Sequence, residues 1–553
     1  MNIYTAITFA PVQGFIEKSR KLRDLYGGSL ILSYLSQKLV EEFHKPPTLE
    51  VISPASHNLQ KGMPNRILIK GYVSQDQAKE VLLRNWKNVL KVCKKWIDTD
   101  NLSQDKFPEF KYEWDREWSL WGCHTWEIFQ GCGCTIKDAM EDLETKKLSR
   151  DWTAVNWIGE SSSLTGTDGI AFPGMGAERR NPKEIKYSDE KKEIEAFYQK
   201  LAEITEQNSE IPEGKFIALN EKLSIPELVK RLVTWPEIAE ELEIQELDKS
   251  FAEIQRKPTE TIRGQWTGWF MGDGDKVGEH LQELAQKENG DKEIKKFSKA
   301  MRNWGKQFDD RFNLKQKLGR VVYAGGDDFL GIIYSEDTQK QISPFTAYEW
   351  LLTLNNTWKK HGEKITVSVG FVWVAGSVPQ RDVLQHCREA EKEAKNLGRN
   401  RVTIRVVFNS GQYVQWTCPW DDLGILMKYR DRDGKTFYEW ECKGRNKDDF
   451  PNWSHVYSDL ATLKARHSFG LSPNKHHTYI NELKVLDNLS GLIDFIEMYF
   501  PGCKDILKNK EKYLVCGNKD PNNVTRKTES APLMITWIED LINIGWHLCS
   551  KPE

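Results

Sequence analysis

The sequence predicts an α+β fold with two ferredoxin-like βαββαβ units, a charged helical insert and a helical C-terminal part. Strand and helix patterns alternate in this order in residues 1–140 and again in residues 262–408. Residues 186–262 read as charged helices, and residues 409–553 combine aromatic-rich turns with apolar helices. With 553 residues, 39% of them hydrophobic, the chain can form several domains with their own cores.

The first unit begins with a strand over residues 1–11, MNIYTAITFAP, which ends in a turn at residues 11–14. A basic helix and the apolar helix SLILSYLSQKLVEEFH follow. The remaining predicted elements are a strand at 65–73, a helix at 76–97 and a strand at 125–134. We therefore expect a first domain at 1–140 and a linker domain at 141–261.

The second unit begins with a strand at 267–272, which ends in a Gly-rich loop. The elements predicted after it are a helix at 291–317, a hairpin at 319–334, a helix at 344–360, a strand at 364–374, a helix at 379–397 and a strand at 401–408. The Gly325–Gly326 pair forms the hairpin turn, because glycine reaches positive φ without steric cost. We expect this domain at 262–408 and a C-terminal helical domain at 409–553.

Acidic side chains stand at the strand ends of the second unit. Asp327 and Asp328 follow the glycine turn, and Asp273 follows the strand at 267–272. Strands in these two places are neighbours in a ferredoxin-like sheet, so the three carboxylates are expected to lie close together. Clustered carboxylates repel one another unless a cation lies between them, and Mg²⁺ prefers such oxygen ligands. The simpler alternative is a hairpin with a polar tip.

Residues suited to phosphate groups surround these acids. A strand, a Gly-rich turn and a helix N-terminus present backbone N–H donors to phosphates, and a cationic helix end neutralises them. The expected nucleotide-binding residues of this unit are Gly274, Asp275, Lys276, Gly278, Gly325, Gly326, Lys395 and Arg399. Together with a metal site they predict phosphoryl or nucleotidyl transfer.

Four segments of the second unit, DGDKVG, YAGGDDFLG, TVSVGFV and AKNLGRNRV, resemble a known palm domain. It is shared by GGDEF diguanylate cyclases and the large subunit of type III CRISPR effector complexes. The turn is GGDD rather than GGDEF, which favours the second family. Residues 7–35 and the PNRIL segment at 64–68 resemble the first palm of the Cmr-type subunit. The resemblance covers the two palms, at about 1–140 and 262–408.

The resemblance implies synthesis of cyclic oligoadenylates from ATP in antiviral defence, switched on when the complex binds target RNA. Asp273, Asp327 and Asp328 would be the catalytic residues and would hold Mg²⁺ or Mn²⁺. The implied partners are other Cmr-type subunits, guide RNA and target RNA. Two alternatives are a non-catalytic scaffold of a guide-RNA complex and a diguanylate cyclase that acts on GTP.

The first palm is expected to lack metals. Its turn PVQGFI occupies the place of DGDKVG and carries no acid before Glu17. It can still form one wall of a nucleotide pocket, with Gln13 and Arg23 as candidate contacts. A solvated charged surface is an equally good interpretation of these two residues.

Cysteine and histidine patterns argue against two other metal sites. The ten cysteines include no CxxC pair, and Cys123, Cys132 and Cys134 beside His124 form one cluster. The spacing of Cys132 and Cys134 places both on one face of a predicted strand, so a core role is expected for these two. The related subunits often carry a four-cysteine zinc module, but here the matching segment 159–176 has no cysteine. We expect a flexible loop there and no zinc. No histidine is followed by Asp, so an HD nuclease site is not expected either.

Composition limits the remaining functions. The net charge of −2 gives no general basic footprint for nucleic acid, which leaves local patches at 18–23, 180–186 and 398–401. Mean hydropathy is −0.61 and no run of 18 apolar residues occurs, so no membrane span is expected. The N-terminus lacks the pattern of a signal peptide, and we expect a cytoplasmic protein.

Overall fold

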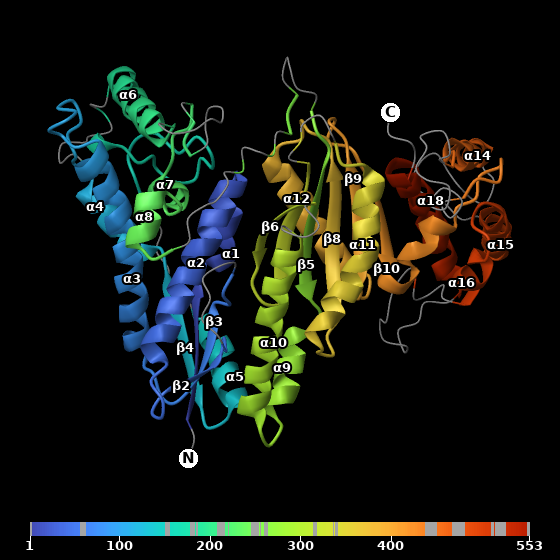
Figure 1. Cartoon of the computed structure of the whole chain (residues 1–553), viewed down its shortest axis with the longest axis horizontal. Helices are drawn as coiled ribbons and strands as arrows, with labels where there is room; N and C mark the ends of the chain where they lie inside the picture. Colours follow the sequence, from blue (N-terminus) through green and yellow to red (C-terminus); the bar gives the residue numbers. More distant parts are fainter. Residues whose placement is uncertain are drawn as a thin grey trace. The chain divides into compact units, whose positions relative to one another are not determined.

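A computed structural model gives the fold of the chain (Figure 1). The residues that it describes are 3–55, 62–149, 155–176, 183, 186–206, 216–218, 220–244, 251, 254, 256–258, 264–312, 318–335, 337, 341–436, 451–466, 482–509, 514 and 527–549. Residues 313–317 of the predicted long helix lie outside this part.

The chain divides into two compact units that cut across the predicted domains. The first unit comprises Met1–Ile254, Gly278–Gln307 and Val322–Gly326. The second comprises Gln255–Val277, Phe308–Val321 and Asp327–Glu553. Most of one helix and the glycine turn of the predicted second palm therefore belong to the first unit. The boundaries of the four predicted domains stay predictions.

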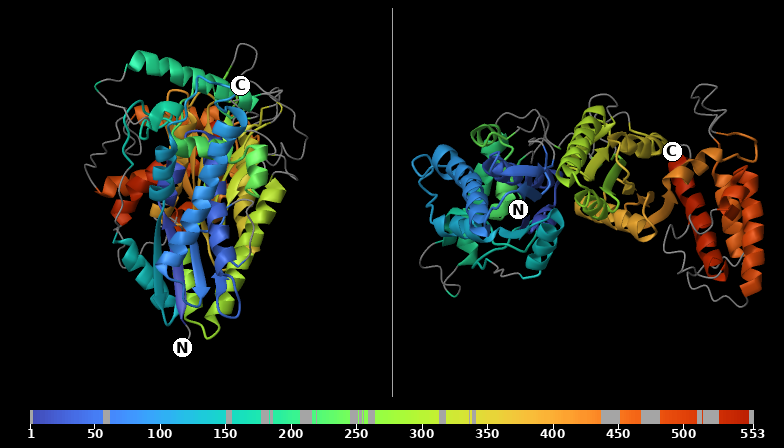
Figure 2. Two further views of the ribbon diagram at one scale, coloured as in Figure 1. Left: turned by 90° about the vertical axis from the view of Figure 1, so that its left-hand side faces the viewer. Right: turned by 90° about the horizontal axis from the view of Figure 1, so that it is seen from below.

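The first unit contains a four-stranded antiparallel sheet of order β2-β3-β1-β4. Its strands are β1 (Tyr4–Ala10), β2 (Glu50–Ser53), β3 (Arg66–Lys70) and β4 (Glu127–Gly133). Helices α2 (Leu22–Phe43) and α3 (Gln75–Lys95) run along the sheet (Figure 2). Helix α5 (Ile136–Lys147) packs on β4 and β1. The short strand β2 was not predicted.

The second sheet has six strands in the order β10-β9-β8-β5-β7-β6. Its strands are β5 (Thr267–Gly274), β6 (Gly319–Ala324), β7 (Asp328–Ile333), β8 (Val367–Val374), β9 (Arg401–Val407) and β10 (Tyr413–Pro419). The order β8-β5-β7-β6 repeats the order β4-β1-β3-β2 of the first sheet. Both sheets are therefore ferredoxin-like, and the predicted α+β class is confirmed.

Aromatic packing on one face of the second sheet holds its strands in place. The ring of Phe270 in β5 lies 4.5 Å from that of Trp350 in α11 (Pro344–Trp358) and also contacts Phe312 and Phe329. Helix α12 (Gln380–Asn396) packs on β8, β9 and β5 and carries Lys395 at its last turn (Figure 1). The rigid sheet thereby fixes where β5 and β7 end.

The remaining helices connect or flank the two sheets. In the first unit they are α1 (Val12–Glu17), a π-helix (Trp96–Asn101), α4 (Asp115–His124), a 3-10 helix (Pro173–Gly176), α6 (Tyr187–Glu206), α7 (Ile225–Leu232) and α8 (Pro236–Glu241). Helices α9 (Val277–Ala285) and α10 (Gly290–Asp310) follow β5. The later ones are two 3-10 helices (Lys359–His361 and Trp420–Lys428), α14 (Ser454–Ala465), α15 (Glu482–Tyr499), α16 (Cys503–Asn509) and α18 (Lys527–Cys549).

The C-terminal part differs from its prediction in one element. It was expected to combine aromatic-rich turns with helices, but Tyr413–Pro419 forms β10, which pairs antiparallel with β9 and extends the second sheet. Its aromatic and β-branched residues fit a strand, so the aromatic-rich turn was interpreted wrongly. Within the described residues, no helix is both long and apolar enough to cross a membrane.

Candidate acidic site of the second palm

Asp273 and Asp328 face each other directly across two neighbouring strands. Asp273 lies near the end of β5, Asp328 begins β7, and the two are cross-strand partners. The backbone N–H of Gly274 donates a 2.8 Å hydrogen bond to the carbonyl of Asp327. Asp273 and Asp328 therefore form the kind of antiparallel pair without mutual backbone hydrogen bonds, in which side chains lie closest. The predicted meeting of the two acidic segments occurs in the structure.

The charge state of Asp328 reflects this crowding. Protein atoms crowd around its carboxyl group, and the carboxylates of Asp327 and Asp273 lie nearby. Burial and then like-charge repulsion raise the pKa of Asp328 to about 7, even though part of the residue remains exposed. A cation beside this carboxyl group would relieve both effects.

In this structure the cation at the site is Lys395. Its ammonium group donates a 2.6 Å hydrogen bond to Asp273 and forms a 2.5 Å ion pair with Glu391, one turn earlier on α12. Burial alone would lower the pKa of Lys395. The hydrogen bonds to Asp273 and Glu391 outweigh burial, so the pKa lies above the ordinary value for lysine. Lys395 is therefore charged and holds Asp273. Glu391 was not predicted, although its four-residue spacing from Lys395 was a readable signal.

The donor chemistry fits Mg²⁺, whereas the geometry is not that of a closed metal site. Carboxylate oxygens are the hard ligands that Mg²⁺ takes, and repulsion at Asp328 is what a divalent cation would remove. Among the described residues, however, no group of three or more carboxylate, imidazole or thiol side chains is placed to hold a metal ion. Lys395 would have to leave Asp273 before that carboxylate could serve as a ligand.

Asp275 has a different environment from the one predicted. It is 5% exposed, and its carboxylate accepts hydrogen bonds from Thr366 Oγ1 (2.7 Å), Ser368 Oγ (2.6 Å) and the backbone N–H of Asn400 (3.0 Å). These bonds tie the loop after β5 to β8 and to the loop before β9. Asp275 therefore positions neighbouring backbone, and we no longer assign it to the nucleotide.

Other predicted nucleotide contacts lie on loops at this end of the second unit. Arg399 is exposed and has a left-handed backbone with φ of 65°. Lys276 is also exposed, with φ of 56°. A Cβ on Gly274 would lie 2.9 Å from Val277 Cγ2 and 3.1 Å from Asp327 Cβ, so only glycine fits there. In the first unit, Gly278 is exposed and faces open space.

The two predicted nucleotide contacts of the first palm differ in their exposure to solvent. Gln13 in α1 is exposed, whereas Arg23 in α2 is 4% exposed. The guanidinium of Arg23 lies 3.5 Å from the ring centroid of Phe216. This stacking places Arg23 in the interior of the first unit, so we no longer count it among the nucleotide contacts.

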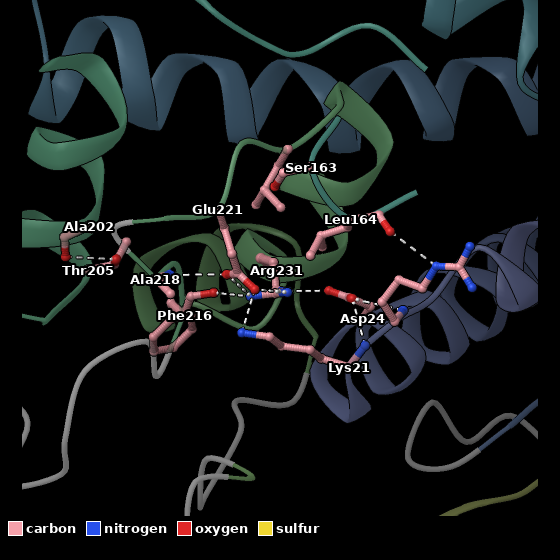
Figure 3. Close-up of polar contacts among 12 residues, drawn as sticks. Lys21, Asp24, Ser163, Leu164, Ala202, Thr205, Phe216, Ala218, Glu221 and Arg231 are labelled. Carbon is pink, nitrogen blue, oxygen red and sulfur yellow. Dashed lines mark hydrogen bonds and ion pairs between the residues drawn. The ribbon is translucent and has the colours of Figure 1, made fainter. Parts of the chain in front are cut away.

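The basic run at 18–23 is used for contacts within the first unit (Figure 3). Lys18 pairs with Asp168 at 2.8 Å, and Arg20 donates a 3.2 Å hydrogen bond to the carbonyl of Leu164. Lys21 pairs with Glu221. The interpretation of this run as a nucleic-acid patch therefore loses its support, because these cations already have partners inside the unit.

Arg231 of α7 is the centre of a buried ion network beside that run (Figure 3). It pairs with Asp24 of α2 and with Glu221, and it donates a 2.5 Å hydrogen bond to the carbonyl of Phe216. Burial raises the pKa of Asp24, but the charge and hydrogen bond of Arg231 outweigh burial and lower it overall. The network joins the first palm to the helical insert.

The cysteine cluster and the segment 159–176 also differ from expectation. Cys134 is exposed and lies beyond the end of β4, so it lacks the predicted core role, whereas Cys132 is half-buried and Cys123 is exposed. The segment at 159–176 was predicted to be a flexible loop, but defined hydrogen bonds hold it. Ser162 Oγ donates to Glu227 (2.5 Å), and Ala171 N–H donates to the carbonyl of Leu223 (2.7 Å). The absence of zinc stays a prediction.

Two comparisons with known families identify parts of this fold. Residues 267–403 match the family model described as Cas10/Cmr2, second palm domain, and residues 4–91 match CRISPR-associated protein Cmr2, N-terminal. A comparison with curated protein sequences gives no match.

Solved structures resemble this chain at low sequence identity, and the first of the two described below shares its fold. A chain of the type III-B Cmr-beta complex in its apo state has a TM-score of 0.52 and 12% identity, over 98% of this chain and 82% of that chain. A chain of the Csm1-Csm4 cassette in complex with cA4 has a TM-score of 0.38 and 16% identity, over 99% of this chain and 70% of that one. The two matched segments, Cmr2 N-terminal at 4–91 and Cas10/Cmr2 second palm at 267–403, make the chain similar to the Cas10/Cmr2 large subunits of type III CRISPR complexes.

Proposed function

We propose that this chain synthesises cyclic oligoadenylates from ATP as the large subunit of a Cmr-type CRISPR effector complex. The observation that carries the proposal is the opposed pair Asp273 and Asp328, with Asp327 adjacent and Lys395 within 2.6 Å of Asp273. Clustered carboxylates that can hold a divalent metal, beside a cation that can pair with phosphates, suit nucleotidyl transfer.

The residues would divide the chemistry between metal binding and phosphate binding. Asp273, Asp327 and Asp328 would hold Mg²⁺ or Mn²⁺, which when bound lowers the pKa of a ribose 3′-hydroxyl and stabilises charge on the triphosphate. Lys395 would leave Asp273 and pair with the β- and γ-phosphates, together with Arg399. The 3′-oxygen then bonds to the α-phosphorus of a second ATP, its proton passes to solvent and pyrophosphate leaves.

The matches of residues 4–91 and 267–403 to the Cmr2 and Cas10/Cmr2 family models support the proposed partners. We place the chain in the cytoplasm in a complex with other Cmr-type subunits, guide RNA and target RNA. Binding of target RNA would start synthesis in antiviral defence. The exposed Gln13 remains a proposed contact of the acceptor nucleotide on the first palm.

One observation favours a second candidate, a non-catalytic scaffold of the same complex. Lys395 holds Asp273, and the described acidic residues form no ready metal site. In a vestigial site the lysine would be a permanent substitute for the metal. The two candidates differ in whether Mn²⁺ displaces Lys395.

The experiment is to incubate the purified complex with Mg²⁺ and target RNA and to identify the products by mass spectrometry. ATP and GTP are supplied in separate reactions. Cyclic oligoadenylates made from ATP by the wild type, and not by Asp327→Ala/Asp328→Ala, would support the proposal. Cyclic diguanylate from GTP would indicate diguanylate cyclase chemistry. Absence of product in a complex that binds its RNA would indicate the scaffold.

A further inference from the structure

The glycine turn that precedes Asp327 is in close backbone contact with a loop of the first palm. Residues 62–65 and the turn both belong to the first compact unit. A Cβ on Gly62 would lie 2.7 Å from the Cα of Gly325, and a Cβ on Gly325 would lie 3.2 Å from the Cα of Gly62. A side chain at Gly62 would collide with this backbone, and Gly62 also has φ of 103°, which favours glycine, while a side chain at Gly325 would be in tight contact with the loop.

The loop that meets the turn is itself held at several atoms. Arg302 of α10 donates a 3.0 Å hydrogen bond to the carbonyl of Gly62, and Ser33 Oγ of α2 accepts a 3.0 Å bond from Met63 N–H. Asn65 Nδ2 donates to Thr8 Oγ1 at 3.1 Å. The loop is thus hydrogen-bonded to α10, α2 and β1, and these bonds restrict its movement against the turn.

The turn is packed tightly from another direction as well. A Cβ on Gly305 of α10 would lie 2.7 Å from the carbonyl oxygen of Ala324. A Cβ on Gly326 would be only in ordinary contact with Pro64 Cγ at 3.8 Å, but Gly326 has φ of 142°, which favours glycine. The turn therefore has little freedom to shift, and the two carboxylates follow it directly in the chain.

We propose that Gly62 and Arg302 are positioning residues, which fix the Gly325–Gly326 turn and thereby the carboxylates of Asp327 and Asp328. Neither residue is assigned to nucleotide or metal. The contact would transmit the state of the first palm to the acidic site, because Ser33 and Thr8 anchor the same loop. This proposal rests on the proposed function for its effect on catalysis, but the effect on the turn is independent of it.

The test compares variants of the full chain, assembled in its complex where activity is measured. Gly62→Ala places a Cβ against the backbone of Gly325 and puts an alanine at a φ of 103°, which favours glycine. Gly71→Ala is the matched control, because Gly71 has φ of 120° and its Cβ would lie 2.7 Å from the carbonyl oxygen of Thr48, within the first palm. Arg302→Met removes the donor to Gly62, and Arg302→Lys keeps a cationic donor.

Hydrogen exchange of peptides that cover residues 320–330 is the first readout, because it needs no catalysis. We expect faster exchange there in Gly62→Ala and Arg302→Met, and exchange near the wild-type rate in Gly71→Ala. The second readout is Mn²⁺ binding followed by electron paramagnetic resonance, which should weaken in the same two variants. The third is kcat for ATP, which should fall by roughly 10- to 100-fold with a smaller change in KM, and Arg302→Lys should recover most of it.

The outcomes separate this proposal from the proposed function. If the wild type makes no oligoadenylate, the proposed function fails. Hydrogen exchange at 320–330 and Mn²⁺ binding then still test whether Gly62 and Arg302 position the turn. If Gly62→Ala does not fold, the two Arg302 variants decide. Equal effects of Gly62→Ala and Gly71→Ala would overturn the proposal, because the contact would then be ordinary packing. Faster exchange with unchanged kcat and Mn²⁺ affinity would overturn it as well.

Discussion

Lys395 donates a 2.6 Å hydrogen bond to Asp273, the residue that faces Asp328 across β5 and β7. The acidic site is therefore balanced by an internal cation on one side only. Asp328, on the other side, keeps a raised pKa despite the partial compensation by Lys395. An imbalance of this kind is typical of sites that accept a cation from solution.

Asp328→Asn should stabilise the fold above pH 7 and abolish product formation. The folded-state pKa of Asp328 is about 7 against an ordinary value of 3.8, so its ionisation opposes folding above pH 7. In EDTA, Asp328→Asn should raise the melting temperature above pH 7, and the gain should disappear below pH 4, where the wild-type carboxyl is neutral in both states. Product formation should be lost. Calorimetry across pH checks the first part, with Asp421→Asn at an exposed position as the control.

Lys395→Met should strengthen metal binding and weaken turnover. Without the ammonium group, Asp273 has no competing partner there, so the Mn²⁺ dissociation constant measured by titration calorimetry should fall. The kcat for ATP should fall as well, since the phosphates lose a cation. Lys392→Met, at an exposed position of the same helix, should change neither quantity. Unchanged Mn²⁺ affinity in Lys395→Met would show that Lys395 does not compete with the metal.

Arg231→Met should strongly destabilise the first unit. The substitution leaves Asp24 and Glu221 buried without their common partner, which typically costs about 3–5 kcal/mol. The free energy of unfolding from urea titration is the measurement. Arg84→Met removes an exposed ion pair with Glu42 and should cost less than about 1 kcal/mol. Similar losses in the two variants would mean that the buried network contributes no more than a surface pair.

Asp24 should make stability depend on pH at the acid end. Its folded-state pKa lies below the ordinary value of 3.8, so its contribution is complete above pH 4 and is lost as pH falls through the folded-state value. The stability deficit of Asp24→Asn should therefore be constant above about pH 5 and shrink at lower pH. A deficit that grows on acidification would contradict the assigned direction of the pKa shift.

The sequence was most informative about elements that adjacent residues specify. The apolar runs on both sides of Gly325–Gly326 predicted β6 and β7, and the carboxylates at their ends predicted the opposed pair Asp273 and Asp328. These signals are local, because a turn and its strands are specified by adjacent residues.

Predictions failed where a partner came from far along the chain. The donors to Asp275 come from Thr366, Ser368 and Asn400, about a hundred residues later, so nothing near DGDKVG indicated that this carboxylate is buried. Arg23 is covered by Phe216 from the insert between the palms. The contact of Gly62 with Gly325 likewise joins distant segments, and a single sequence contains no signal for it.

The most direct test of the central claim is Mn²⁺-dependent product synthesis by the complete complex with target RNA and ATP. The account predicts cyclic oligoadenylates and pyrophosphate from the wild type, none from Asp327→Ala/Asp328→Ala, and equal assembly of both complexes. If the double variant assembles and makes the same products at the wild-type rate, Asp327 and Asp328 do not form the catalytic site. The central claim would then be contradicted.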